Sequence, residues 1–233
     1  DLGQKKTWLW SFVSPRCTLF KMSDTRAAET PQTILSTHFS GTICTDRYAG
    51  YNTWNSRRQI CWAHLKRNIQ AVIDGGGDGF RIGSRLMSVL NRMFTLWHRY
   101  RSGKIRHATL RRQIEAQCQY QFYEALEDGQ RCSHAPTVTL CQDLFARYDQ
   151  LWQFTEHVGL EPTNNRAERS LRHAVIWRKL SYGTQSESGS RFVETLLTII
   201  ETCRQQSRHL LDFLTEALSA HTSRHPAPQL IPP

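Results

Sequence analysis

The chain has 233 residues, of which 39% are hydrophobic and 10% aromatic, so it can bury a substantial core and is not intrinsically disordered. No apolar run approaches the roughly 18 residues of a membrane span, which excludes an integral membrane protein. The 30 Lys and Arg exceed the 20 Asp and Glu and give a formal net charge of +10. Most of these cations are Arg, whose guanidinium binds phosphate in a bidentate manner, so the charge favours a polyanionic partner such as nucleic acid.

The cysteines and the first residues indicate the cellular setting. The seven cysteines are odd in number and include no Cys-x-x-Cys spacing, which favours reduced thiols in a cytoplasmic protein over a disulfide framework. The chain begins at Asp1 with polar residues and has neither an initiator Met nor a signal peptide. We therefore expect a fragment of a longer protein.

The first third of the chain predicts short strands and one longer helix. An alternating apolar pattern predicts an antiparallel hairpin over 7–22, with a turn at Ser14–Pro15–Arg16. A helix is expected within 26–38, near Pro31. A short apolar strand over 41–45 ends directly before Asp46.

A second short strand is expected over 59–62, and a helix follows it. The Gly-rich segment 74–79 is expected to be irregular. From 80 to 158 we predict three helices and no strand, because apolar residues recur there at helical spacing. The apolar face of the helix after 62 contains Leu65, Ile69, Val72 and Ile73.

The last third of the chain is predicted to be helical. The run Pro162–Asn165 is a start signal for a helix that extends to about Leu180. A loop is expected over 181–190, and further helices over 192–203 and 210–218.

Asp46 is the first candidate functional residue, because it closes a buried strand. The alternative is that its carboxylate only caps the following turn, a common role for Asp. Glu168 is the second candidate, and it too has a structural alternative. With Asn165 it resembles a helix capping box, and the helix dipole favours a carboxylate in the first turn.

Four cations on the helix that carries Glu168 are candidate phosphate ligands. They could equally form a solvated face of the helix. Two carboxylates on separate elements would suit Mg²⁺, because pairs of such ions promote phosphoryl transfer. Spacing alone does not show that Asp46 and Glu168 converge. The four cations are Arg169, Arg172, Arg178 and Lys179.

Five short motifs occur in a characteristic order along the chain. Together they closely resemble the insertion sequence 66 family of bacterial DDE transposases, over most of the chain from Trp8 to about Leu218. The motifs are Thr45–Tyr51, Cys61–Arg67, Asn164–Arg169, Trp177–Lys179 and Glu187–Arg191.

This resemblance implies an α/β fold with a ribonuclease-H-like mixed sheet, an all-helical insertion domain and a helical C-terminal part. The expected division is a first part of the core over 1–75, without its first strand, and an insertion over 76–160. Core helices that carry the final Glu would follow over 161–222, before a flexible tail over 223–233.

The resemblance also implies the chemistry. Asp46 and Glu168 would be the second and third acidic residues of the triad and would hold two Mg²⁺ or Mn²⁺ ions for DNA cleavage and strand transfer. His64 and Arg67 would lie near the active site or the DNA. The implied partners are transposon ends and target DNA, bound by a homo-oligomer. No membrane partner is expected, and the protein would be cytoplasmic and associated with the nucleoid when bound.

One feature of the family is not matched in these residues. The first acidic residue of the triad belongs on a strand that precedes Trp8–Leu9–Trp10, and Asp1 does not occupy that place. We therefore expect a truncated catalytic domain with little or no activity. Two alternatives remain: a DNA-binding remnant of a decayed transposase without chemistry, and a purely structural helical protein.

Overall fold

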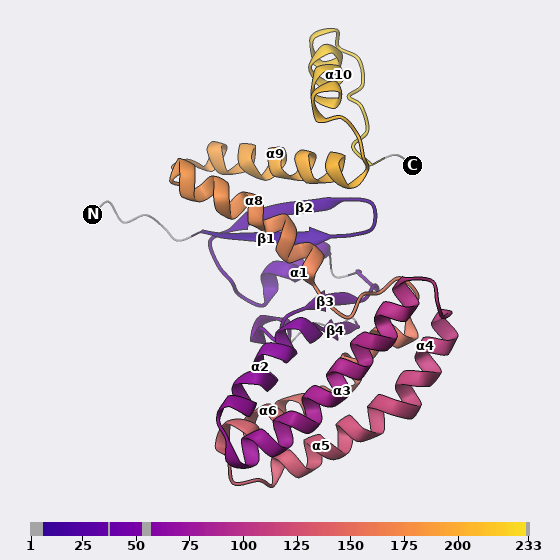
Figure 1. Cartoon of the computed structure of the whole chain (residues 1–233). Helices are drawn as coiled ribbons and strands as arrows, with labels where there is room; N and C mark the ends of the chain where they lie inside the picture. Colours follow the sequence, from indigo (N-terminus) through magenta and orange to yellow (C-terminus); the bar gives the residue numbers. More distant parts are fainter. Residues whose placement is uncertain (1–6, 37, 53–56, 232–233) are drawn as a thin grey trace, which may run out of the picture. The chain divides into compact units, whose positions relative to one another are not determined.

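A computed structural model describes residues 7–36, 38–52 and 57–231 (Figure 1). The protein is a mixed α/β chain that consists mostly of helices, with a few short strands. It divides into two compact units. The terminal unit combines Asp1–Ser36 with Asn165–Pro233, and the central unit is Thr37–Asn164. None of the helices in the described ranges is long and apolar enough to cross a membrane.

The terminal unit contains the predicted hairpin. Strands β1 (Trp8–Val13) and β2 (Thr18–Ser23) pair antiparallel, from Trp8 opposite Ser23 to Val13 opposite Thr18. Ser14 bonds back to Cys17 in the turn, which confirms the hairpin prediction. The helices of this unit are α1 (Glu29–Leu35), α8 (Asn165–Ser181), α9 (Glu187–Gln205) and α10 (Leu210–Thr222).

Helix α9 lies along β2 and satisfies its outer edge with side chains (Figure 1). Glu194, Thr198 and Thr202 follow one another at a spacing of four residues, so they share one face of the helix. They accept hydrogen bonds from the backbone N–H groups of Met22, Phe20 and Thr18. These three alternate N–H groups of β2 are therefore bound by side chains of α9, which protects this edge from the addition of a further strand.

The central unit joins a short parallel strand pair to a helical block. Strands β3 (Ile43–Thr45) and β4 (Arg58–Ile60) pair in parallel, with Thr45 opposite Ile60. The helices that follow are α2 (Trp62–Asp74), α3 (Gly77–Arg101), α4 (His107–Ile114), α5 (Tyr120–Gln130), α6 (Ala135–Ala146) and α7 (Gln153–Glu156). Short 3₁₀ turns lie at Ala49–Tyr51 and Tyr148–Leu151, and a π-helical segment at Glu115–Gln119 links α4 to α5.

Buried aromatic and amide side chains connect the strand pair to the helical block. The Trp62 ring lies 5.2 Å from that of Phe122 and 4.9 Å from that of Trp152, centroid to centroid. Gln59 is fully buried in β4 and donates to the carbonyl oxygens of Ile60 and Leu151. Its Oε1 accepts from the N–H of Phe154 at 2.9 Å. These contacts make β4 part of the same core as the helices.

The structure confirms a mixed α/β class but not one mixed sheet. In the described part of the chain the four strands pair two by two, as β1–β2 and as β3–β4. A ribonuclease-H-like sheet therefore stays a prediction. The assignment of 76–160 as an insertion also stays a prediction, since nothing in the structure tests it. Residues 225–230 have no regular structure, although Arg208 and Gln206 donate to the carbonyl oxygens of Gln229 and Leu230.

Several predicted boundaries need correction. Helix α3 begins at Gly77, inside the segment 74–79 that we expected to be irregular. Helix α9 begins at Glu187, because the Ser186 hydroxyl caps it by accepting from the N–H of Gly189. The predicted third helix of the middle region is split, since α6 ends at Ala146 and a 3₁₀ turn precedes α7. The apolar pattern identified the buried faces of α2 and α3 but did not show these breaks, and some residues of the later stripes, such as Phe192 and Leu218, are exposed.

Candidate functional site

Asp46 directly follows β3, as the sequence predicted, and its side chain is half-buried. Its Oδ1 accepts a hydrogen bond from the N–H of Tyr48 at 3.0 Å. The carboxylate therefore does cap the following turn, which is the structural alternative considered above. The hydrogen bond from Tyr48 uses Oδ1, so this cap is compatible with metal binding through Oδ2.

Arg58 holds the backbone around Asp46. This residue of β4 is only 4% exposed. Its guanidinium donates to the Asp46 carbonyl oxygen at 2.6 Å, to Thr45 Oγ1 at 2.9 Å and to Asn52 Oδ1 at 3.2 Å. Burial lowers the pKa of Arg58 from its ordinary value, with a further contribution from the nearby charge of Arg147. Asp46 and Asp143 partly offset this effect.

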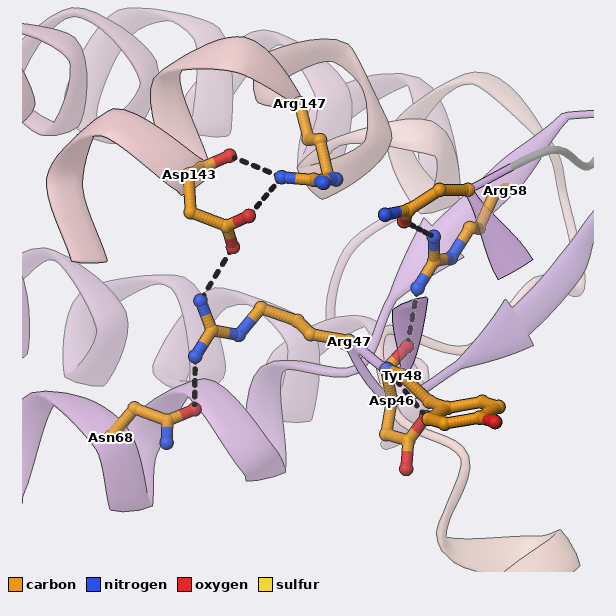
Figure 2. A network of polar contacts seen from close by, with 8 residues as sticks. Asp46, Arg47, Tyr48, Arg58, Asn68, Asp143 and Arg147 are labelled. Atoms are coloured by element: carbon orange, nitrogen blue, oxygen red, sulfur yellow. Dashed lines mark hydrogen bonds and ion pairs between the residues drawn. The ribbon is translucent and has the colours of Figure 1, made fainter. Parts of the chain in front are cut away.

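Arg47 links the same loop to two helices of the central unit. Its guanidinium donates to Asp143 Oδ2 on α6 at 2.6 Å and to Asn68 Oδ1 on α2 at 3.2 Å. Asp143 also pairs with Arg147, so one carboxylate lies between two guanidinium groups. Figure 2 shows that the Arg47 side chain reaches toward Asn68 and Asp143, whereas the Asp46 carboxylate points away from both.

A shallow groove opens beside the Arg47–Asp143 pair, between α2 and α6. Its volume is about 590 Å³. The predicted residues His64 and Arg67 lie on the first turns of α2, where His64 is half-buried and Arg67 is exposed. The groove is lined by Arg47, Asn68, Ala71, Val72, Pro136, Thr139, Leu140 and Asp143.

The nearest thiol to this loop is not suited to nucleophilic chemistry. Cys44 lies in β3, two residues before Asp46, and burial raises its pKa well above the ordinary value. The neighbouring Cys61 and Glu161 raise it further. Because the thiolate is the reactive form, this raised pKa disfavours nucleophilic chemistry at Cys44.

Glu168 lies in the first turn of α8, and its side chain is exposed. Helix α8 begins at Asn165, so Asn165 is its first helical residue and not the N-cap of the predicted capping box. Ser170 on the same helix bonds to Ser11 of β1 at 2.7 Å between the two hydroxyl oxygens. The hairpin therefore fixes the position of the turn that carries Glu168 within the terminal unit.

The predicted DNA-binding cations of α8 are all exposed. Arg169 and Arg172 lie near its start, and Arg178 and Lys179 lie in its last turn. Arg169 Nε donates to the backbone oxygen of Asn165 at 3.3 Å. Exposed guanidinium and ammonium groups on one helix can bind phosphates, and they can equally be solvated.

The two candidate carboxylates belong to different units, Asp46 to the central one and Glu168 to the terminal one. Their convergence stays a prediction. Among the residues that the structure describes, no three His, Cys, Asp or Glu side chains form a cluster that could hold a metal ion. The carboxylate of Asp46 nevertheless has the donor type that Mg²⁺ and Mn²⁺ prefer.

Sequence reasoning missed the side chains that hold the Asp46 loop. Arg58, Asp143 and Arg147 were not singled out, although Arg47 lies within the motif Thr45–Tyr51. The only local signal for Arg58 was its position directly before the predicted strand over 59–62. For Asp143 there was none, because its partner is 96 residues away along the chain.

Comparison with known proteins defines the class to which the chain belongs. Residues 2–191 match the family described as "Transposase IS66 family", whose name denotes DNA-processing enzymes. The chain therefore belongs to this transposase family.

The chain is also 24% identical, over 251 aligned residues, to the uncharacterized protein y4qI of Sinorhizobium fredii. The alignment covers 97% of this chain and 46% of y4qI. The chain thus spans about half the length of the curated relative that it matches. No solved structure matches it.

Proposed function

We propose that this chain is part of a DDE-type transposase that cleaves DNA and transfers strands at the ends of an insertion sequence. The observation that carries the proposal is the placement of Asp46. It follows the parallel strand β3 directly, its loop is held by buried and half-buried arginines, and it lies within the family match. Active-site carboxylates are favoured at such strand ends, where a rigid scaffold supports a loop.

The proposed fold is a ribonuclease-H-like mixed sheet with a helical insertion. In its support, the chain forms one antiparallel and one parallel strand pair, the two kinds of pairing that a mixed sheet combines. The helical block from α3 to α7 separates β4 from α8 in sequence, as an insertion before the final carboxylate would.

In this proposal Asp46 and Glu168 hold Mg²⁺ or Mn²⁺. When bound, a pair of such ions activates the attacking oxygen and stabilises the leaving oxygen in phosphoryl transfer. Tyr48 N–H keeps the Asp46 carboxylate in place through Oδ1. The exposed cations of α8 bind DNA phosphates, with His64 and Arg67 near the DNA. The chain works as a homo-oligomer on paired DNA ends.

Iron-directed cleavage tests whether Asp46 and Glu168 converge. With added hydrogen peroxide as oxidant and ascorbate to regenerate Fe²⁺, Fe²⁺ bound in place of Mg²⁺ produces hydroxyl radicals that cut the polypeptide next to the ion. We expect cuts near both residue 46 and residue 168, lost in Asp46→Asn and in Glu168→Gln. Asp128→Asn, an exposed carboxylate on α5, is the matched control and should cut like the wild type. Cuts at only one of the two sites would refute the shared metal site.

DNA cleavage by residues 1–233 themselves is expected to be weak. No position in them matches the first acidic residue of the family, and two carboxylates hold two divalent ions poorly. A nicking assay with Mn²⁺ on DNA that contains an insertion-sequence end measures this. Strong cleavage that Glu168→Gln abolishes would show that two carboxylates are enough.

A further inference from the structure

The contacts around Asp46 come from both of its neighbours in sequence and from three separate elements. Arg58 on β4 binds the Asp46 carbonyl oxygen and the Thr45 hydroxyl. The Thr45 hydroxyl in turn donates to the same carbonyl oxygen at 2.8 Å. The Asp46 carbonyl oxygen therefore accepts from two donors, the Arg58 guanidinium and the Thr45 hydroxyl, and the same guanidinium also binds that hydroxyl.

The far end of the loop is tied to the same guanidinium. Arg58 donates to Asn52 Oδ1, and its guanidinium carbon lies 5.4 Å from the centre of the Tyr51 ring. A planar fork can satisfy three acceptors in fixed directions at once, which a lysine ammonium cannot do with the same geometry. Arg58 thus closes the loop over residues 45–52 from inside the strand pair.

The second attachment comes from the helical block. Arg47 is anchored to Asp143 on α6 and to Asn68 on α2, on the side from which the Asp46 side chain points away (Figure 2). Asp143 is itself fixed, because Arg147 donates both to its carboxylate and to its backbone oxygen. Arg47, the residue that follows Asp46, is therefore anchored by a carboxylate 96 positions away along the chain.

We propose that Arg58 and the Arg47–Asp143 pair are positioning residues that orient the Asp46 carboxylate, so that the helical block is a working part of the metal site. This inference rests on the proposed function for the role of Asp46 as a metal ligand. Groups that hold metal ligands commonly alter metal affinity by about 10-fold to 100-fold when they are replaced.

The test uses Mn²⁺ titration of the full chain, followed by electron paramagnetic resonance of free Mn²⁺, with Asp46→Asn to identify binding at this site. The test variants are Arg58→Lys and Asp143→Asn. Each has a matched control in the same unit: Arg57→Lys, an exposed neighbour, and Asp128→Asn, an exposed partner of Arg85. We expect about 10-fold weaker Mn²⁺ binding in both test variants and less than 2-fold change in both controls.

Amide hydrogen exchange at Tyr48 provides a readout that does not depend on metal. Its N–H is bonded to Asp46 Oδ1, so a released loop should exchange about 10-fold faster, while the core amides of α3 exchange as before. Unchanged Mn²⁺ affinity and unchanged Tyr48 exchange in both test variants would overturn the inference. So would faster exchange with wild-type Mn²⁺ affinity, because the contacts would then serve only the fold.

The two proposals fail in different ways. If the wild type shows no Mn²⁺ binding that depends on Asp46, the metal site of the proposed function is refuted. Tyr48 exchange then decides alone whether Arg58 and Asp143 hold the loop. If Arg58→Lys does not fold, Asp143→Asn, which keeps the shape of the side chain, gives the same two readouts.

Discussion

The two strand pairs of this protein are stabilised in different ways. Strands β1 and β2 pair over six residues each, and the outer edge of β2 is covered by side chains of α9. Strands β3 and β4 pair over only three residues each. Their support comes from the polar side chains of β4 itself, since Arg58 and Gln59 are both buried there.

The comparison shows where a short strand pair finds its stability. Three ladder positions supply few backbone hydrogen bonds, so buried side chains must supply the rest, and each needs partners to be tolerated. Gln59 finds its partners in the helical block, and Arg58 finds them in the loop of Asp46. The shorter strand pair is thus the one whose supporting contacts also reach the candidate site.

Replacing Gln59 should have the largest effect on stability. Gln59→Leu leaves the buried N–H of Phe154 and the carbonyl oxygen of Ile60 without their amide partner. We expect a loss of about 3 kcal/mol in the free energy of unfolding, measured by urea denaturation. Gln70→Leu, on the exposed face of α2, should change it by less than about 0.5 kcal/mol. Equal losses in the two variants would contradict the role of Gln59 in connecting β4 to the helical block.

Removing one hydroxyl from α9 should have a smaller effect on the other strand pair. Thr202 is fully buried, and its Oγ1 both accepts from the Thr18 N–H and donates to the Thr18 carbonyl. Thr202→Val keeps the shape and removes both bonds, so we expect a loss of about 2 kcal/mol in thermal or urea unfolding. The control is Thr195→Val, because Thr195 is exposed on the same helix. An equal loss of stability in both variants would contradict the role of Thr202 in covering the edge of β2.

Substitutions of Glu194 distinguish its hydrogen bond to the strand edge from its ion pair with Lys21. It accepts from the Met22 N–H and pairs with Lys21, whose side chain is 48% exposed. Glu194 itself is buried, but the half-exposed Lys21 ammonium is screened by solvent, and Gln keeps an acceptor for the Met22 N–H, so Glu194→Gln should cost only a few tenths of a kcal/mol. Glu194→Ala should cost about 1 kcal/mol, because the strand edge loses an acceptor. Urea denaturation at two salt concentrations distinguishes the two contributions, and a large loss in Glu194→Gln would mean that charge dominates.

The smallest effect concerns an exposed contact of the central unit, and it depends on pH. The backbone N–H and hydroxyl of Ser133, with help from Arg81, lower the pKa of Asp78 to about 2. A carboxyl with a lowered folded pKa contributes stability that is present above its unfolded value near 4 and is lost as pH falls through 2. The stability difference between wild type and Asp78→Asn should therefore shrink between pH 5 and pH 2. A difference that stays constant over this range would contradict the assignment.

Much of the fold follows from local patterns. Alternation predicted the hairpin of β1 and β2, helical periodicity located the apolar faces of α2 and α3, and the start signal at Pro162–Asn165 predicted α8. The positions of Asp46 after a strand and of Glu168 in a first helical turn were also predicted correctly. Helix ends were less accurate, because a cap such as Ser186 and the 3₁₀ turn at Tyr148–Leu151 depend on a few polar contacts.

The sequence by itself determined the family, through five ordered motifs, and the candidate carboxylates within them. The tertiary structure alone decided what holds Asp46. Burial of Arg58 and the pairing of Arg47 with Asp143 depend on contacts between residues far apart in the chain. Hydrophobic periodicity reports which face of an element is buried, but a guanidinium finds its acceptors only when the folded backbone brings them within hydrogen-bonding distance.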